Sequence, residues 1–155
     1  MVAKETPTFH FHNANPKGRK VCDCVVRAIS VALGQSWEQT MREMTDLGLK
    51  DGRPYNEPKN IEKYLASRGW TKQKEPRTFN NKKMPMCDFL NNAGSSGVII
   101  ATVGSHHLTL IADRVNWDIW NCTRQTMHTY FTNPKAVAPK LEREEPKPEK
   151  RRFTL

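Results

Sequence analysis

Apolar side chains recur with helical spacing in the first half of the chain. Between positions 24 and 33 they fall at i, i+3, i+4 and i+7 and so share one helix face. Asp23 before this run suits a helix N-cap, and Gly34 after it suits a helix C-terminus. The pattern therefore predicts a helix over 24–33 with Cys24 in its first turn. The residues of the apolar face are Val25, Ala28, Ile29 and Ala32.

The same spacing predicts two further long helices, one at about 37–47 and one that starts at Pro58. Ser36 and Gln39 form the pattern of a capping box before the first of them. Proline suits the first position of the second. A short fourth helix is expected at 85–90. The apolar stripes of the two long helices, which we assign to the core, are Trp37, Met41, Met44 and Leu47, and Ile61, Tyr64 and Leu65.

The second half of the chain changes to short apolar runs typical of β-strands. An uninterrupted run at 97–103 predicts a buried strand, and runs at 107–111, 115–120 and 127–131 predict three more. Asp113-Arg114 suits a hairpin turn between the second and the third. Helices followed by strands indicate an α+β fold in which the strands form a small antiparallel sheet.

Composition divides the chain into three parts. Residues 1–21 are polar and rich in turn formers, which predicts an N-terminal arm or loop. Residues 22–133 carry the helical and strand patterns and predict one α+β domain. From 134 to 155 prolines alternate with charges, which predicts an extended tail with few contacts to the core. We expect such a tail to contact other proteins.

The chain of 155 residues has 25 basic and 16 acidic residues, a net charge of +9. This charge favours an anionic partner such as nucleic acid, although a basic protein with scattered lysines has the same balance. No apolar run reaches the length of a membrane span, and the start lacks the apolar run of a signal peptide. We therefore expect no membrane contact and a cytoplasmic location, where all four cysteines are reduced thiols.

Cys24 is the first candidate for chemistry. In the first turn of a helix, unpaired N–H groups and the positive end of the dipole lower the pKa of a thiol. An imidazole brought close by the fold would lower that pKa further and serve as a base. Asp23 opposes this effect with an adjacent negative charge. The alternative role for Cys24 is that of a small buried hydrophobe.

Two histidines stand at the start of the strand at 107–111, and strand alternation lets only one of them face the thiol. We select His107 over His106, because His107 directly precedes the apolar strand. In the next strand Asp118 lies among large apolar side chains and needs a partner, for which an imidazole N–H is suited. Asn121 is the rival for this third position.

Neither a metal nor another cofactor is expected. Cys22, Cys24 and Cys122, with His106 or His107, offer enough ligands for zinc. Their spacing, however, departs from the pairs two to four residues apart that hold structural zinc.

Several motifs, taken in order, resemble small papain-like cysteine peptidase domains of bacteriophage and bacterial genomes, which are distantly similar to double-glycine leader peptidases. The resemblance covers about residues 13–131 and spares both termini. It lies in Asn13-x-Asn15-Pro16-x-Gly18-Arg19-Lys20-x-x-Asp23-Cys24-Val25-Val26-Arg27-Ala28-Ile29, Gly34-Gln35-Ser36-Trp37, Tyr64-Leu65-x-x-x-Gly69-Trp70, Gly97-Val98-Ile99, His107-Leu108-Thr109 and Trp117-Asp118-x-Trp120.

The resemblance implies a papain-like fold and a thiol hydrolase that acts on peptide or isopeptide bonds of a protein or peptide substrate. Cys24 would be the nucleophile, His107 the base and Asp118 the orienting acid. The alternative is a catalytically inactive domain of the same fold, a structural or virion-associated protein that contacts other assembly proteins through its tail. The expected location is then the host cytoplasm or the virion.

The chain departs from the papain pattern at the oxyanion hole. That pattern places a glutamine a few residues before the nucleophile, whereas the stretch from Lys17 to Asp23 has neither Gln nor Asn. Asn13, Asn15 or Lys20 are the candidates to replace it, with the backbone N–H of Cys24 as second donor. The loss of one such donor typically lowers the rate on the order of 10²–10³-fold.

Overall fold

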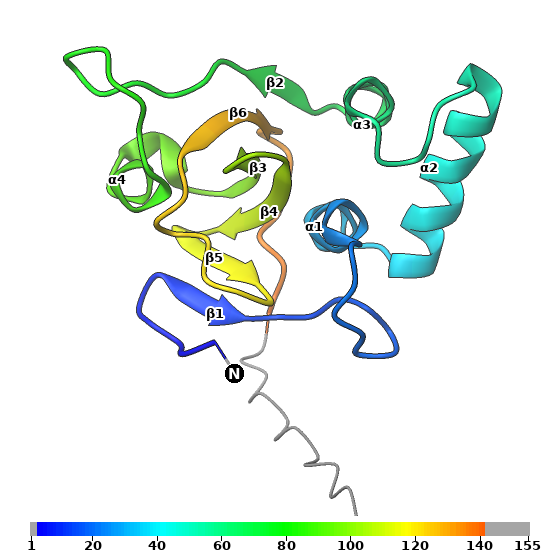
Figure 1. Cartoon of the computed structure of the whole chain (residues 1–155), viewed down its shortest axis with the longest axis horizontal. Helices are drawn as coiled ribbons and strands as arrows, with labels where there is room; N and C mark the ends of the chain where they lie inside the picture. Colours follow the sequence, from blue (N-terminus) through cyan, green and yellow to red (C-terminus); the bar gives the residue numbers. More distant parts are fainter. Residues whose placement is uncertain (1–2, 142–155) are drawn as a thin grey trace, which may run out of the picture.

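The computed structural model describes residues 3–141 (Figure 1). The helices are α1 (Cys24–Leu33), α2 (Trp37–Asp51), α3 (Pro58–Ser67) and α4 (Met86–Leu90), with a 3₁₀ turn at Ala93–Ser95. The strands are β1 (Phe9–Phe11), β2 (Thr71–Gln73), β3 (Val98–Val103), β4 (His107–Ala112), β5 (Val115–Asp118) and β6 (Met127–Thr132). The α+β class predicted from the sequence is confirmed.

The four predicted helices are present, and local signals explain their ends. Gly34 ends α1 with a backbone φ of 64°, a value that favours glycine. Ser36 caps α2 by accepting a hydrogen bond from the Gln39 N–H at 3.1 Å. The predicted end of α2 at residue 47 is one turn too early, because α2 runs on to Asp51.

Asp23 stands at the N-cap position of α1 but does not cap the helix with its side chain. Its carboxylate instead accepts hydrogen bonds from the Asn15 amide at 2.9 Å and the Trp37 indole at 3.0 Å, and it pairs with Arg27 at 3.2 Å. These contacts fix the start of α1 to the preceding loop and to α2.

The sheet is six-stranded, in the order β1-β5-β4-β3-β6-β2, and the prediction of a small antiparallel sheet is right for the pairings among β2 to β6 and wrong for β1, whose parallel pairing makes the sheet mixed. Strand β1 pairs with β5 in parallel, with Phe9 opposite Asn116, and it lies within the segment 1–21 expected as an arm. Strand β2 pairs antiparallel with β6. At three residues each, both added strands are too short to display a period.

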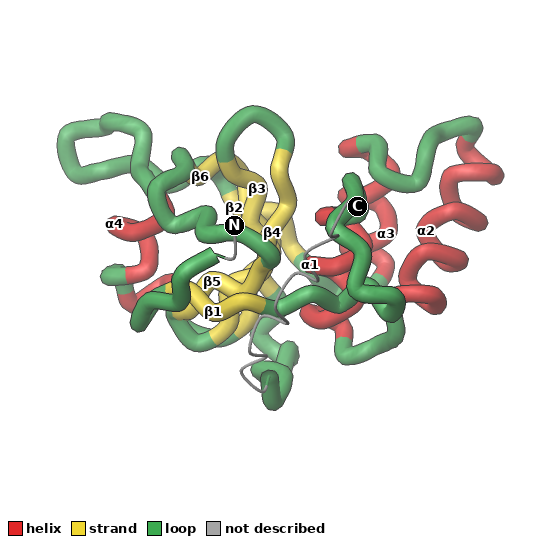
Figure 2. The backbone as a smooth tube through the Cα atoms, turned by 60° about the horizontal axis from the view of Figure 1, so that its bottom comes forward, coloured by secondary structure: helices red, strands yellow, loops and turns green. Residues whose placement is uncertain are grey.

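The sheet separates two apolar clusters. Helix α1 lies against one face of the sheet, α2 packs on α1 and α3 farther from the strands, and α4 lies apart from them against the other face (Figures 1 and 2). Alternate residues of β3 serve both faces: Val98 and Ile100 join the larger cluster, whereas Ile99, Ala101 and Val103 join the smaller one. The uninterrupted apolar run therefore reflects a strand covered on both sides.

The described part of the C-terminal segment packs on the domain. Ala136, Ala138 and Leu141 are partly buried against the larger apolar cluster. The expectation of few core contacts for residues 134–155 is therefore wrong for 134–141, where small apolar side chains fit the cluster without a regular period. The rest of the predicted tail lies outside the described residues.

Among residues 3–141, no helix is both long and apolar enough to cross a membrane.

A truncation series tests the role of residues 134–141. We expect a chain that ends at Asn133 to have a free energy of unfolding about 1–2 kcal/mol below that of a chain that ends at Leu141, because it loses partly buried apolar surface. Urea unfolding of the two chains measures the difference. Equal unfolding free energies would show that the segment lies on the surface without stabilising the domain.

Candidate functional site

Helix α1 presents Cys24 as its first residue, half-buried in the first turn. Cys24 and His107 line a cleft of about 670 Å³ between the helices and the sheet. The free N–H groups and the dipole of the ten-residue helix α1 point to this end, where they favour a thiolate.

His107 opens β4, and Asp118 ends β5, the strand paired with β4. The Nε2 atom of His107 lies 2.7 Å from Oδ2 of Asp118. This bond leaves Nδ1 available for Cys24, which lines the same cleft and lies near enough for the imidazole to influence its thiol. The structure thus brings together the three residues selected from the sequence. His106 is exposed and lines the same cleft.

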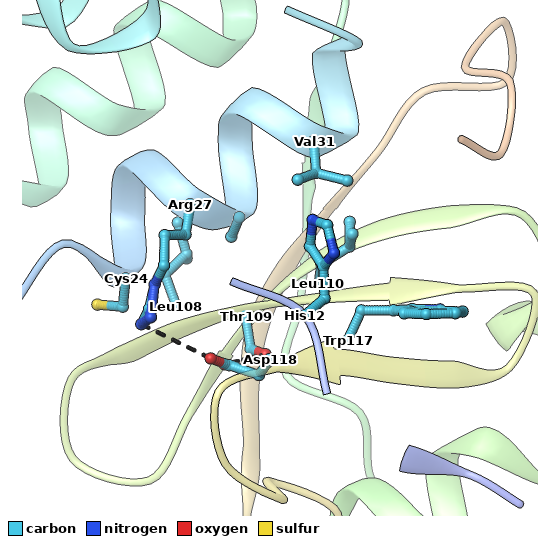
Figure 3. Close-up of a pocket in the computed structure, with 10 residues that line it drawn as sticks. His12, Cys24, Arg27, Val31, Leu108, Thr109, Leu110, Trp117 and Asp118 are labelled. Carbon is cyan, nitrogen blue, oxygen red and sulfur yellow. Dashed lines mark hydrogen bonds and ion pairs between the residues drawn. The ribbon is translucent and has the colours of Figure 1, made fainter. Parts of the chain in front are cut away.

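The Asp118 carboxylate is only 5% exposed and is held from several sides. Thr109 donates its hydroxyl to Oδ2 at 2.6 Å, and the buried Asn116 amide donates to that hydroxyl at 2.9 Å. Arg27 extends from α1 and reaches Oδ1 at 3.6 Å (Figure 3). A buried carboxylate with this many donors and a nearby cation stays ionised.

These contacts lower the pKa values of Cys24 and Asp118 and raise the pKa of His107. Burial opposes each charged form, but neighbouring groups outweigh it. For Cys24 the hydrogen bonds from His107 and the Leu108 backbone, with the charges of His107 and Arg27, lower the thiol pKa. For His107 the bond to Asp118 is the main cause that raises the pKa to about 11. The pKa of Asp118 is lowered, chiefly by the bond with His107.

The lowered pKa of Cys24 and the raised pKa of His107 both favour a thiolate beside an imidazolium. This is the state in which a cysteine attacks a carbonyl without prior proton loss.

Two further residues surround the imidazole. The Trp120 ring lies 4.8 Å from the His107 ring, between centroids, at an interplanar angle of 49°. Cys122 is fully buried, and its Sγ lies 3.5 Å from Oδ2 of Asp118. Burial raises the pKa of Cys122 to about 11, whereas the pKa of Cys24 is lowered.

The side chains proposed for the oxyanion hole lie elsewhere. The Asn13 amide donates to the Arg19 carbonyl at 3.1 Å, and the Asn15 amide donates to Asp23. Lys20 is exposed, and none of the three side chains lines the cleft around Cys24. Asn13 and Asn15 organise the loop before α1, and the backbone N–H of Cys24 remains the candidate donor.

Asn121 does not contact His107 through its side-chain oxygen, which accepts hydrogen bonds from the backbone and hydroxyl of Thr123 at 3.0 and 2.6 Å. Asp118 holds the third position instead.

Comparison with protein-family models, with curated proteins and with solved structures finds no match. The papain-like relationship accordingly stays a prediction from the motifs.

Alkylation of Cys24 by iodoacetamide tests the ion pair and the choice of histidine. At about pH 6, below the ordinary thiol pKa of about 8.5, we expect Cys24 to react much faster than the exposed Cys22 and Cys87. His107→Ala should slow this reaction by about tenfold or more, the change in thiolate fraction for one pKa unit. The difference between the two rates should shrink as the pH rises, because Cys24 is then ionised in the wild type and in His107→Ala alike. Mass spectrometry of the labelled peptides gives each rate.

His106→Ala is the matched control and should leave the rate at Cys24 unchanged. A strong effect of His106→Ala with none of His107→Ala would contradict the pairing.

Proposed function

We propose that this chain is a papain-like thiol hydrolase that cleaves peptide or isopeptide bonds. One observation carries the proposal. The 2.7 Å bond from His107 Nε2 to Asp118 fixes the imidazole and leaves Nδ1 available for Cys24, which stands at the N-terminus of α1 and lines the same cleft. An imidazole fixed by a carboxylate beside a nucleophile is the arrangement that acyl transfer requires.

Acylation begins when the Cys24 sulfur attacks the carbonyl carbon of the scissile bond. The C–S bond forms, and the π electrons of the carbonyl move to its oxygen. The backbone N–H of Cys24 is placed to donate to this oxyanion. The oxyanion then collapses, the C–N bond breaks, and Nδ1 of the imidazolium gives its proton to the leaving amine. A thioester on Cys24 remains.

Deacylation uses the same groups in reverse. His107, now neutral, takes a proton from a water molecule that attacks the thioester carbon. The C–S bond breaks, the carboxylic acid product leaves, and the thiolate–imidazolium pair is restored. Asp118 keeps the ring in one orientation through both steps, and Thr109 and Arg27 keep Asp118 in place.

The cleft suits an extended chain that presents apolar side chains. At about 670 Å³ it lies within the usual size of ligand sites, and its walls are largely apolar. Lys72 and Glu62, both lining residues, pair with each other. The apolar lining residues include Val25, Ile61, Leu108, Ile119, Trp120 and Phe131.

Cleavage of a peptide library tests the proposed reaction. Incubation with the wild-type chain should create new peptide termini, detected by mass spectrometry, and Cys24→Ala should create none. Asp118→Asn should reduce the rate on the order of 10²-fold, because the misplaced ring lies too far from the reacting atoms. Cys87→Ser is the matched control, since Cys87 is exposed outside the cleft, and it should cleave at the wild-type rate.

An absence of new termini, together with fast alkylation of Cys24, would restrict the proposal to substrates other than linear peptides. An absence of both would favour the inactive, structural alternative.

A further inference from the structure

A second thiol completes a cluster of three different donor atoms around the Asp118 carboxylate. The atoms are Nε2 of His107, Oδ2 of Asp118 and Sγ of Cys122, and all lie within 4.8 Å of one another. The first two are 2.7 Å apart, and the last two are 3.5 Å apart. The proposed hydrolysis uses His107 and Asp118 but assigns no role to Cys122.

We propose that His107, Asp118 and Cys122 form a binding site for a zinc-like divalent cation. Imidazole nitrogen, carboxylate oxygen and thiolate sulfur are the donors that Zn²⁺ prefers, and three protein ligands leave a fourth position open. Binding releases the proton of the Cys122 thiol and the proton on Nε2 of His107 to solvent, as metal binding to such ligands requires. Asp118 and Cys122 are four residues apart, within the spacing usual for paired zinc ligands.

A tetrahedral ion sets the distances that the three donors must reach, and in the structure Nε2 of His107 and Sγ of Cys122 lie within 4.8 Å, so the imidazole has to approach the sulfur for the ion to bind. Zinc bonds of about 2.0–2.3 Å in a tetrahedron place neighbouring donors roughly 3.2–3.7 Å apart. The distance between Asp118 and Cys122 already matches. The imidazole has to move about 0.5 Å away from the carboxylate, and His107 is placed to allow this, since it begins β4 directly after the turn at 104–106.

The surrounding structure holds two of the ligands in place. Asn116 accepts a hydrogen bond from the Cys122 N–H at 3.0 Å, and its amide bonds the Thr109 hydroxyl that contacts Asp118. This outer layer is buried and joins β4, β5 and the turn that carries Cys122. Partners of this kind orient metal ligands and strengthen metal binding.

The consequence for the reaction, which rests on the proposed function, is reversible inhibition. A cation on Nε2 replaces the hydrogen bond between His107 and Asp118. The ring is then held by the metal and no longer moves a proton between the thiol and the leaving amine. The site would switch off when zinc is available and switch on when a chelator removes it.

Calorimetric titration of the reduced full-length chain with zinc chloride tests the site directly. We expect binding of one equivalent by the wild type, and the same affinity in Cys24→Ser and Cys87→Ser. Cys122→Ser should weaken binding by on the order of 10–100-fold or more. With Co²⁺ in place of Zn²⁺, the wild type should show a thiolate-to-metal absorption band that Cys122→Ser lacks.

Three results would overturn the proposal: no binding by the wild type, unchanged binding by Cys122→Ser, or loss of binding in Cys24→Ser. Asp118→Asn provides a second ligand variant if circular dichroism shows Cys122→Ser to be unfolded, and it too should bind weakly. The titration needs no turnover, so zinc binding by the wild type would support the metal site even if the zinc-free chain shows neither cleavage nor fast alkylation of Cys24 and the hydrolase is thereby refuted.

Discussion

The buried Asp118 carboxylate is the group on which the site depends. A charge that is 5% exposed has to be matched, and here an imidazole at 2.7 Å and a guanidinium at 3.6 Å match it. Arg27 also pairs with Asp23, which Trp37 and Asn15 hold. One chain of contacts therefore connects the loop before α1, α1 itself and β5, and it sets the position of the nucleophile relative to its base.

The same arrangement separates the roles of the two thiols near the imidazole. Cys24 is the first residue of α1, and the helix N-terminus, the charge of Arg27 and the Leu108 backbone favour its thiolate. Cys122 is more deeply buried and lies beside the Asp118 charge, and both raise the pKa of its thiol. The two thiols thus differ through their positions in the fold, and this difference is the basis for the nucleophile proposed at Cys24 and the metal ligand proposed at Cys122.

The sequence predicted a helix or strand where the repeating pattern of apolar residues extended over enough positions to be recognised. It predicted the helices and β3 to β6, and the position of His107 directly before an apolar strand led to its selection in preference to His106. It missed β1 and β2, which have three residues each. It also missed Thr109 and Asn116, because their bonds to Asp118 and Cys122 depend on the register of β4 against β5. The ion pair of Arg27 could have been predicted, because Arg27 follows Asp23 at i, i+4, the spacing at which opposite charges meet on a helix.

The central claim is that the resting site holds a thiolate–imidazolium pair, and ¹⁵N NMR of the His107 ring tests it most directly. The account predicts that both ring nitrogens carry protons at neutral pH and remain protonated well above about pH 6.5, the ordinary histidine pKa. Asp118→Asn should bring the titration of this ring back toward that value. A His107 ring that is singly protonated at neutral pH in the wild type, and that titrates near about 6.5, would contradict the account.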